Sequence, residues 1–293
     1  MGFGGSSGGS GSLSGSSDVA LSGVANSQVL AYDTSVNKWK NKTLSIPTGG
    51  TASTDLLDAC GIFYAAVATR NADVRRIVFV GSSTTAGQAA SAVQFRYVNQ
   101  LAAAIHARYP LVSGSHPPVS NNLATGYAAR DSYSTGIHVI NAGVGGTTSA
   151  NYIGATELNQ IAEMRPSMIV HMIGTNDFRT KMAVSTYKAN HLARINALKS
   201  AMNGSPCVHL LIHPFEAWDT SNPVAPWSDY GEAKREIALD SPNDTAYMDI
   251  SKPYYLVGVP STDPLDLITT DKLHQNDSGY TLMADLIRMR LNL

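Results

Sequence analysis

Charged residues and cysteines are scarce in this sequence, and each shortage excludes a class of protein. Charged side chains make up only 15% of the 293 residues, and the formal net charge is -1. No basic stripe therefore suggests a nucleic-acid partner. The two cysteines, Cys60 and Cys207, are too few for a disulfide framework, and their apolar neighbours favour buried free thiols.

Long apolar runs and metal-ligand clusters are also lacking. No apolar run reaches the length of a membrane span, and no signal peptide is visible. No group of histidine, cysteine and carboxylate residues has the spacing of a metal site. We therefore expect neither a membrane-spanning segment nor a bound metal.

Composition divides the chain into three parts. Residues 1–23 are mostly glycine and serine, which is typical of a flexible linker. Residues 24–53 include VANSQVLAYDTSVNKWKNKTLSIP, where two short stretches flank a turn-like DTSVN and predict a hairpin too small to fold stably alone. From 54 to 293 the composition is that of a globular domain, in a chain that is 43% apolar.

The stretches QVLAYD and KWKN, at residues 28–33 and 38–41, resemble short segments that recur in bacteriophage tail and fibre proteins. This resemblance implies a structural protein of the virion that forms homo-oligomers and contacts other tail proteins. An ordinary linker with a surface hairpin is the alternative interpretation.

Short apolar runs alternate with helical patterns over the rest of the chain. Buried runs of this length, separated by helices, predict a parallel sheet covered on both faces, which is an α/β/α sandwich. Residues 110–135, rich in serine, proline, glycine and asparagine, predict a long loop or lid. The predicted strands are 77–80, 137–140, 168–173, 208–212 and 246–250, and the longest predicted helices lie near 90–108, 181–202, 229–239 and 278–291.

Polar, glycine-containing loops follow the first three of these strands. They are Gly-Ser-Ser at 81–83, Asn-Ala-Gly-Val-Gly-Gly at 141–146 and Gly-Thr-Asn-Asp at 174–177. If the strands are parallel, all three loops leave the same edge of the sheet, which is where open α/β sheets bind ligands. Their convergence is stronger evidence for a site than any one loop.

These loops offer the groups that acyl transfer needs. Ser83 offers a hydroxyl, the glycines can expose backbone N–H groups, and Asn176 offers an amide donor for an oxyanion. A serine hydroxyl needs a base, and His274 has Asp271 three residues before it, where a carboxylate can reach the imidazole Nδ1. The alternative is that Ser83 only caps the helix that follows the strand.

Aromatic residues and a further histidine follow the fourth predicted strand. His213 ends that strand at the same edge, and Trp218 lies shortly after it, so both are candidates for substrate binding. Phe215, Trp227 and Tyr230 extend the stretch and predict a platform for a sugar or an acyl chain. A place in the core is the alternative for these aromatic residues.

Four segments together resemble the sequence blocks of the SGNH (GDSL) hydrolase superfamily. They are GSSTTAG at 81–87, NAGVGG at 141–146, GTND at 174–177 and DKLH at 271–274, in the order that the family has them. The resemblance implies a flavodoxin-like sandwich with a five-stranded parallel sheet, and a serine esterase that needs no cofactor. It implies that Ser83 is the nucleophile, that Asp271 and His274 activate it, and that the N–H groups of Ser83 and Gly146 and the amide of Asn176 form the oxyanion hole.

The match departs from the family pattern at two positions. Ser82 stands where an aspartate usually precedes the nucleophile, and Gln275 stands where a proline often follows the histidine. Neither departure removes a reacting group. The elbow Gly-x-Ser-x-Gly of a different hydrolase fold is disfavoured because position 85 is threonine.

Members of the family cleave several kinds of acyl compound, including lysophospholipids, thioesters and the acetyl esters of carbohydrates. Together with the tail-like segment, this implies an ester on a bacterial cell-surface glycan or envelope lipid as the substrate. The alternative is a receptor-binding tail module that has lost turnover, which the intact Ser83, Asp271 and His274 disfavour.

Overall fold

The computed structural model describes three short strands near the N-terminus and most of the chain from residue 60 onward. The described residues are 19–20, 28–33, 38–43, 60–152, 155–217, 222–241, 243–256 and 262–293. The chain divides into two compact units, Met1–Thr51 and Ala52–Leu293. No helix among the described residues is long and apolar enough to cross a membrane.

The first unit contains a small sheet. Strands β2 (Gln28–Asp33) and β3 (Lys38–Thr43) pair antiparallel, and β1 (Val19–Ala20) pairs parallel to β3 on its other side. Apart from β1, the linker predicted at residues 1–23 lies outside the described residues.

The second unit is built on a parallel sheet of five strands in the order β5-β4-β6-β7-β8. All five predicted strands are confirmed. The central strands β6 and β7 are buried on both faces, as a parallel sheet covered by helices requires, whereas residues of the edge strand β8 are in part half-buried. The strands are β4 (Val74–Gly81), β5 (Gly136–Asn141), β6 (Met168–Met172), β7 (Val208–His213) and β8 (Thr245–Asp249).

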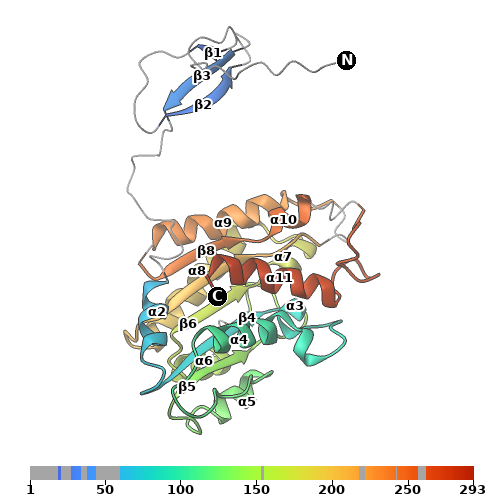
Figure 1. Cartoon of the computed structure of the whole chain (residues 1–293). Helices are drawn as coiled ribbons and strands as arrows, with labels where there is room; N and C mark the ends of the chain where they lie inside the picture. Colours follow the sequence, from blue (N-terminus) through green and yellow to red (C-terminus); the bar gives the residue numbers. More distant parts are fainter. Residues whose placement is uncertain are drawn as a thin grey trace, which may run out of the picture. The chain divides into compact units, whose positions relative to one another are not determined.

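Helices cover both faces of this sheet, so the predicted α/β/α sandwich is confirmed. Successive side chains of a strand point to opposite faces, and in β4 Ile77 and Phe79 pack into one core cluster while Val78 and Val80 pack into another. Figure 1 shows α4 and α11 side by side on one face. That face is covered by α2 (Gly61–Ala68), α4 (Tyr97–Arg108), α10 (Ser251–Leu256) and α11 (Asp277–Arg290), and the other by α6 (Ala155–Glu163), α8 (Val184–Ala201) and α9 (Trp227–Asp240).

The strand order places two predicted loops next to each other. The chain runs from β4 to β5 on one side and then returns to β6 on the other side of β4. Such a reversal leaves a crevice at the carboxyl ends of the two strands on either side of it, here β4 and β6, and α/β proteins bind ligands in this crevice. The loops that follow β4 and β6 carry Ser83 and Asn176, on the short helices α3 (Ser83–Ala86) and α7 (Thr175–Arg179).

Residues 110–135 differ from the predicted loop. They contain α5 (Leu123–Ala128), which begins where the Asn122 side chain accepts a hydrogen bond from Ala124 N–H. The segment packs along the edge strand β5, since Ser120 bridges to Ile140 and a Cβ on Gly126 would meet the Ile140 side chain at 2.6 Å. The sequence did not predict this helix, because turn-forming residues dominate the segment. The Asn122 cap and the buried Leu123 stabilise it.

Candidate active site

Ser83 lies at the first position of helix α3, and only Ser82 separates it from the end of β4. The residue that caps this helix is Ser82, whose backbone is extended, with φ -92° and ψ -153°. The Ser83 hydroxyl instead donates to His274 Nε2 over 2.8 Å. The capping role considered for Ser83 is therefore wrong. The turn is held by Asn141, whose Nδ2 donates to Thr85 O at 2.7 Å.

The His274 ring lies between Ser83 and Asp271, which are far apart in the sequence. Its Nδ1 is 2.6 Å from Asp271 Oδ2, while its Nε2 faces the Ser83 hydroxyl. An ionised carboxylate only accepts hydrogen bonds, so Nδ1 carries the proton and Nε2 is free to accept one. The structure thus brings together the hydroxyl, imidazole and carboxylate that the sequence singled out.

Four hydrogen bonds hold the Asp271 carboxylate. Oδ1 accepts from the Thr269 hydroxyl at 2.6 Å and from the N–H groups of Leu273 and His274 at 2.9 Å each, and Oδ2 accepts from the His274 ring. Partial burial raises the pKa of Asp271, but these hydrogen bonds outweigh burial and leave the pKa well below its usual range. The carboxylate therefore stays ionised at neutral pH. No pattern in the sequence pointed to Thr269.

The two other predicted donors, Gly146 on the loop after β5 and Asn176 on α7, lie on segments that a hydrogen bond joins. Asn176 Nδ2 donates to Thr147 O at 2.8 Å, and its amide has a second hydrogen left for another acceptor. Gly146 is exposed, with φ +79° and no atom within 4 Å of a Cβ built on it. A Cβ on the preceding Gly145 would lie 3.9 Å from Ser83 Cβ, so this loop passes beside Ser83. The backbone at Gly146 is thus open to a ligand at the Ser83 turn.

Gly143 lets the same loop approach the backbone of α3. A Cβ at this position would lie 2.3 Å from Ala86 N and 2.6 Å from the Thr85 carbonyl carbon. We expect Gly143→Ala to displace the Ser83 turn, to lower kcat at least about tenfold and to destabilise the domain by about 1–3 kcal/mol. Steady-state kinetics and thermal melts measure both effects. The control Gly61→Ala meets no atom within 4 Å and should change neither, and equal behaviour of the two variants would contradict the packing argument.

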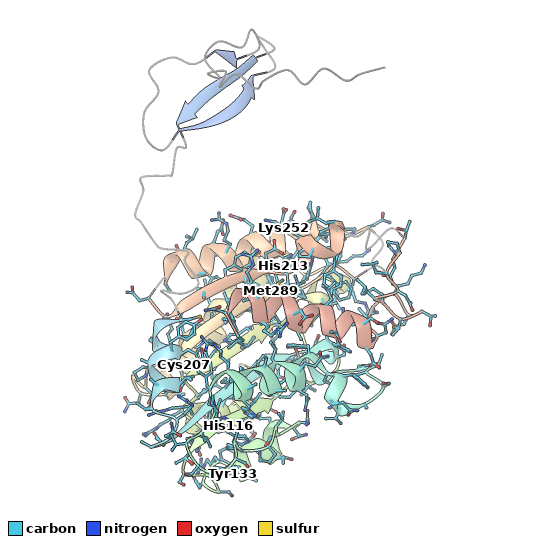
Figure 2. All side chains as sticks on the ribbon, viewed as in Figure 1. His116, Tyr133, Cys207, His213, Lys252 and Met289 are labelled. Carbon is cyan, nitrogen blue, oxygen red and sulfur yellow. The ribbon has the colours of Figure 1, made fainter. Side chains whose placement is uncertain are left out.

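The structure places His213 inside the domain. Figure 2 labels His213 among the side chains of the domain. The residue is 1% exposed, and its ring stacks on Trp227 with ring centroids 4.4 Å apart. Trp227, Tyr230 and Phe215 are also buried, and Trp227 and Tyr230 form an aromatic cluster with Phe178. The predicted platform is therefore wrong for these three aromatic residues, which fill the core, and His213 does not reach the surface of the site. Trp218 lies outside the described residues.

Lys234 is buried beside this cluster and has an unusual charge state. Its Nζ donates to Ile212 O at 2.5 Å, and burial, aided by the charge of Arg194, lowers the pKa of Lys234 to about 7. An unfolded chain keeps this lysine protonated up to about pH 10. Between pH 7 and 10 the unfolded state therefore binds more protons, so this residue makes the free energy of unfolding rise with pH.

We expect Lys234→Met to remove that dependence. In urea unfolding at pH 7.5 and 9.5, the variant should gain stability over the wild type at the lower pH, and the gain should shrink by more than about 1 kcal/mol at the higher pH. Other titrating groups cancel in the difference between the two proteins. A difference in stability that does not change with pH would show that Lys234 is charged in the fold.

Metal ligation has no visible basis in the part of the chain that the structure covers. No group of three or more His, Cys, Asp or Glu residues there could hold an ion. The groups that converge on Ser83 are a hydroxyl, an imidazole, a carboxylate and amide donors, and that set is equipped for attack on a carbonyl carbon.

Comparison with known proteins places this geometry in a family context. The model of the GDSL-like Lipase/Acylhydrolase family matches residues 79–282, a span that holds Ser83, Gly146, Asn176, Asp271 and His274. None of the curated proteins is similar enough in sequence to match.

Solved structures share the fold at low sequence identity. A two-domain esterase active on acetylated mannans matches with a TM-score of 0.57 and 18% identity, over 82% of this chain and 55% of its own. This chain therefore spans about half of that protein. A catalytic mutant of the acetylxylan esterase Axe2 from Geobacillus stearothermophilus matches with a TM-score of 0.52 and 17% identity, over 75% of this chain and 94% of its own.

A third match comes from a psychrotrophic esterase. EstA from Pseudoalteromonas sp., inhibited by monoethylphosphonate, has a TM-score of 0.53 and 17% identity, over 74% of this chain and 97% of its own. At such identities the likeness establishes the fold, and the match to the family model carries the assignment of the chemistry.

Proposed function

Since the chain belongs to the GDSL-like lipase/acylhydrolase family and is a serine hydrolase, we propose that it removes acetyl or other short acyl groups from an esterified glycan. Ser83 is the nucleophile, His274 the base and Asp271 the group that orients the base. The observation that carries this proposal is the His274 ring, with Asp271 at 2.6 Å from one nitrogen and Ser83 at 2.8 Å from the other.

The first half of the reaction forms an acyl-enzyme. His274 Nε2 takes the hydroxyl proton while Ser83 Oγ attacks the ester carbonyl, and the ionised Asp271 stabilises the imidazolium that results. The negative charge that develops on the carbonyl oxygen is met by the N–H groups of Ser83 and Gly146 and by the free amide hydrogen of Asn176. His274 then gives its proton to the alcohol oxygen as the C–O bond breaks.

The second half releases the acid and restores the enzyme. His274 Nε2 accepts a proton from a water molecule, which attacks the acyl carbon of the Ser83 ester. The same donors stabilise the second oxyanion, and the imidazolium returns its proton to Ser83 Oγ as the acid leaves. Every proton moves between His274 and an oxygen atom, so the residues named are sufficient for the cycle.

Two considerations support a short acyl group on a carbohydrate. Ser83 and His274 are only 8% and 5% exposed, so a small acyl group approaches the nucleophile more easily than a bulky one. Two of the solved structures that share the fold are described as an esterase active on acetylated mannans and an acetylxylan esterase. A lipid ester is the competing substrate class that the sequence also implied.

A panel of esters tests the proposal. The full chain is assayed with p-nitrophenyl esters from acetate to palmitate, with acetylated xylan and mannan oligosaccharides, and with a lysophospholipid. We expect kcat/KM to be highest for acetate and to fall at least about tenfold by the octanoate, with acetate released from an acetylated oligosaccharide. A preference for long chains or for the lysophospholipid would replace the glycan with a lipid, and no hydrolysis of any ester would overturn the function.

The virion context rests on the QVLAYD and KWKN stretches alone, and it stays a prediction. We propose that the esterase acts as part of a phage tail, on a surface glycan of the host bacterium. Detection of the chain in purified virions by mass spectrometry would support this location, and light scattering would measure the homo-oligomer that a tail fibre implies. A monomer that is absent from virions would contradict both.

A further inference from the structure

A fully buried serine lies three residues beyond Gly146, and every polar group that it has is bonded. Ser149 N–H donates to both carboxylate oxygens of Asp177, at 2.8 and 3.0 Å, and Ser149 Oγ donates to Asp177 Oδ1 at 2.5 Å. The same Oγ accepts from Asn190 Nδ2 at 2.9 Å, and Ser149 O accepts from Arg194 Nη1 at 3.0 Å. Ser149 is thus the centre of a buried network that joins the loop after β5 to α7 and α8.

Arg194 brings a positive charge into this interior. Its side chain is 0% exposed, and its other nitrogens reach His191 Nδ1 at 2.7 Å and His171 Nδ1 at 3.4 Å. Burial lowers the pKa of Arg194 to about 10, so the guanidinium keeps its charge at neutral pH. The two histidines are buried and their pKa values are lowered, so they are neutral acceptors.

Opposite charges therefore hold the two ends of Ser149. The cation of Arg194 binds its C=O. Burial raises the pKa of Asp177, but the hydrogen bonds that its carboxyl group accepts from the Ser149 N–H and hydroxyl counter this shift and favour the ionised form. Hydrogen bonds with a charged partner are about twice as strong as neutral ones, and a low-dielectric interior strengthens them further. Such a clamp allows the loop little freedom at Ser149.

These contacts of Ser149 constrain both segments that carry the proposed oxyanion donors, which are the loop of Gly146 and helix α7 with Asn176. Asp177 is the direct neighbour of Asn176 on α7, and Ser149 follows Thr147, whose C=O accepts from the Asn176 amide at 2.8 Å. The Thr147 hydroxyl in turn donates to Gly81 O at 3.1 Å. Fixing Ser149 against Asp177 thus fixes the loop of Gly146 against the helix of Asn176.

We propose that Arg194 and Ser149 are positioning residues of the oxyanion hole, which set the distance between Gly146 N–H and the Asn176 amide. The inference rests on the proposed function and adds residues that the four sequence blocks do not contain. Oxyanion donors must lie about 2.7–3.1 Å from the charge that develops in the transition state. A looser clamp should therefore lower kcat and leave KM almost unchanged.

The test compares Arg194→Met, Arg194→Lys and Ser149→Ala in the full chain. Turnover of p-nitrophenyl acetate is expressed per active site, titrated with a phosphonate that labels the nucleophile. We expect kcat to fall about 10- to 100-fold in Arg194→Met, with KM within about threefold, and to recover in part in Arg194→Lys, which restores the charge. Ser149→Ala, which removes only the hydroxyl, should lower kcat about three- to tenfold.

Two controls distinguish a positioning role of Arg194 and Ser149 from a role in stability alone. His209→Leu changes a buried side chain one step removed from Arg194, since His209 Nδ1 lies 3.1 Å from His171 Nε2, and it should lower the melting temperature without changing kcat per site. In an Asn176→Ala background, Arg194→Met should lower kcat by a clearly smaller factor than in the wild-type background, because one of the two donors that it positions is gone. Equal losses in both backgrounds would overturn the inference.

The outcomes also separate this inference from the function itself. If Ser83→Ala abolishes turnover and folded Arg194→Met keeps kcat per site within twofold of the wild type, only the positioning role is wrong. If Ser83→Ala retains turnover, the proposed function fails first. Should neither Arg194 variant fold, Ser149→Ala decides, and an unchanged kcat in that variant overturns the proposal.

Discussion

Ser83→Ala should lower kcat for an ester substrate by at least about 10³-fold while the fold stays intact. The variant removes the oxygen that forms the acyl-enzyme and the hydrogen bond to His274 Nε2, and water then has to attack with the remaining groups alone. Because a hydroxyl is lost and no volume is added, the melting temperature should change by only a few degrees. Initial rates and thermal melts measure the two quantities.

The neighbouring serine supplies a matched control. Ser82 is buried to a similar extent, and its side chain makes no capping hydrogen bond to α3. Ser82→Ala should therefore retain kcat within a few-fold of the wild type, although it alters the position where the family usually has aspartate. A large loss of kcat in Ser82→Ala with a small loss in Ser83→Ala would show that Ser83 is not the nucleophile.

Asp271→Asn should lower kcat by about 10³- to 10⁴-fold, although it changes a single atom of the side chain. The amide oxygen can still accept from the N–H groups of Leu273 and His274, as Asp271 Oδ1 does. The amide nitrogen then faces His274 Nδ1 and donates to it, which moves the imidazole proton to Nε2. An Nε2 that carries a proton cannot accept one from Ser83, so the base is lost while the geometry is kept.

A control for the loss of charge lies on α11. The Asp285 side chain is 47% exposed, the same fraction as that of Asp271, and it also bonds a basic side chain, with Arg288 at 3.1 Å. Asp285→Asn should leave kcat unchanged. If Asp271→Asn keeps more than about a tenth of the wild-type kcat, the carboxylate is not needed to set the tautomer of His274, and its assigned role is wrong.

The strands and the convergence of the loops were predictable because their signals are local. Strands β5, β6 and β7 are short, mostly apolar runs that are buried throughout, and the alternation of such strands with helices favours parallel pairing. Parallel pairing alone brings the loops after β4 and β6 to one edge, so Ser83 and Asn176 could be placed near each other. His274 was found through Asp271, three residues before it.

Features that depend on packing could not be predicted in this way. Trp227 was expected to face the substrate, yet it lies in the core. The prediction failed because a cluster of aromatic residues in the sequence does not reveal which of them the rest of the chain covers. The contact of Arg194 with Ser149 joins residues 45 apart on different elements, and no periodic pattern signals it. The helix within residues 110–135 was missed because its turn-forming residues outweighed a short apolar signal.

Labelling with a fluorophosphonate and mapping of the adduct by mass spectrometry test the central claim most directly. Such a reagent reacts with a serine only where a base has activated the hydroxyl and where donors stabilise the tetrahedral oxygen. We predict one adduct per chain, on Ser83, with loss of esterase turnover in proportion to labelling and no adduct in His274→Ala. An adduct on another serine, or full turnover in a chain labelled at Ser83, would contradict the account.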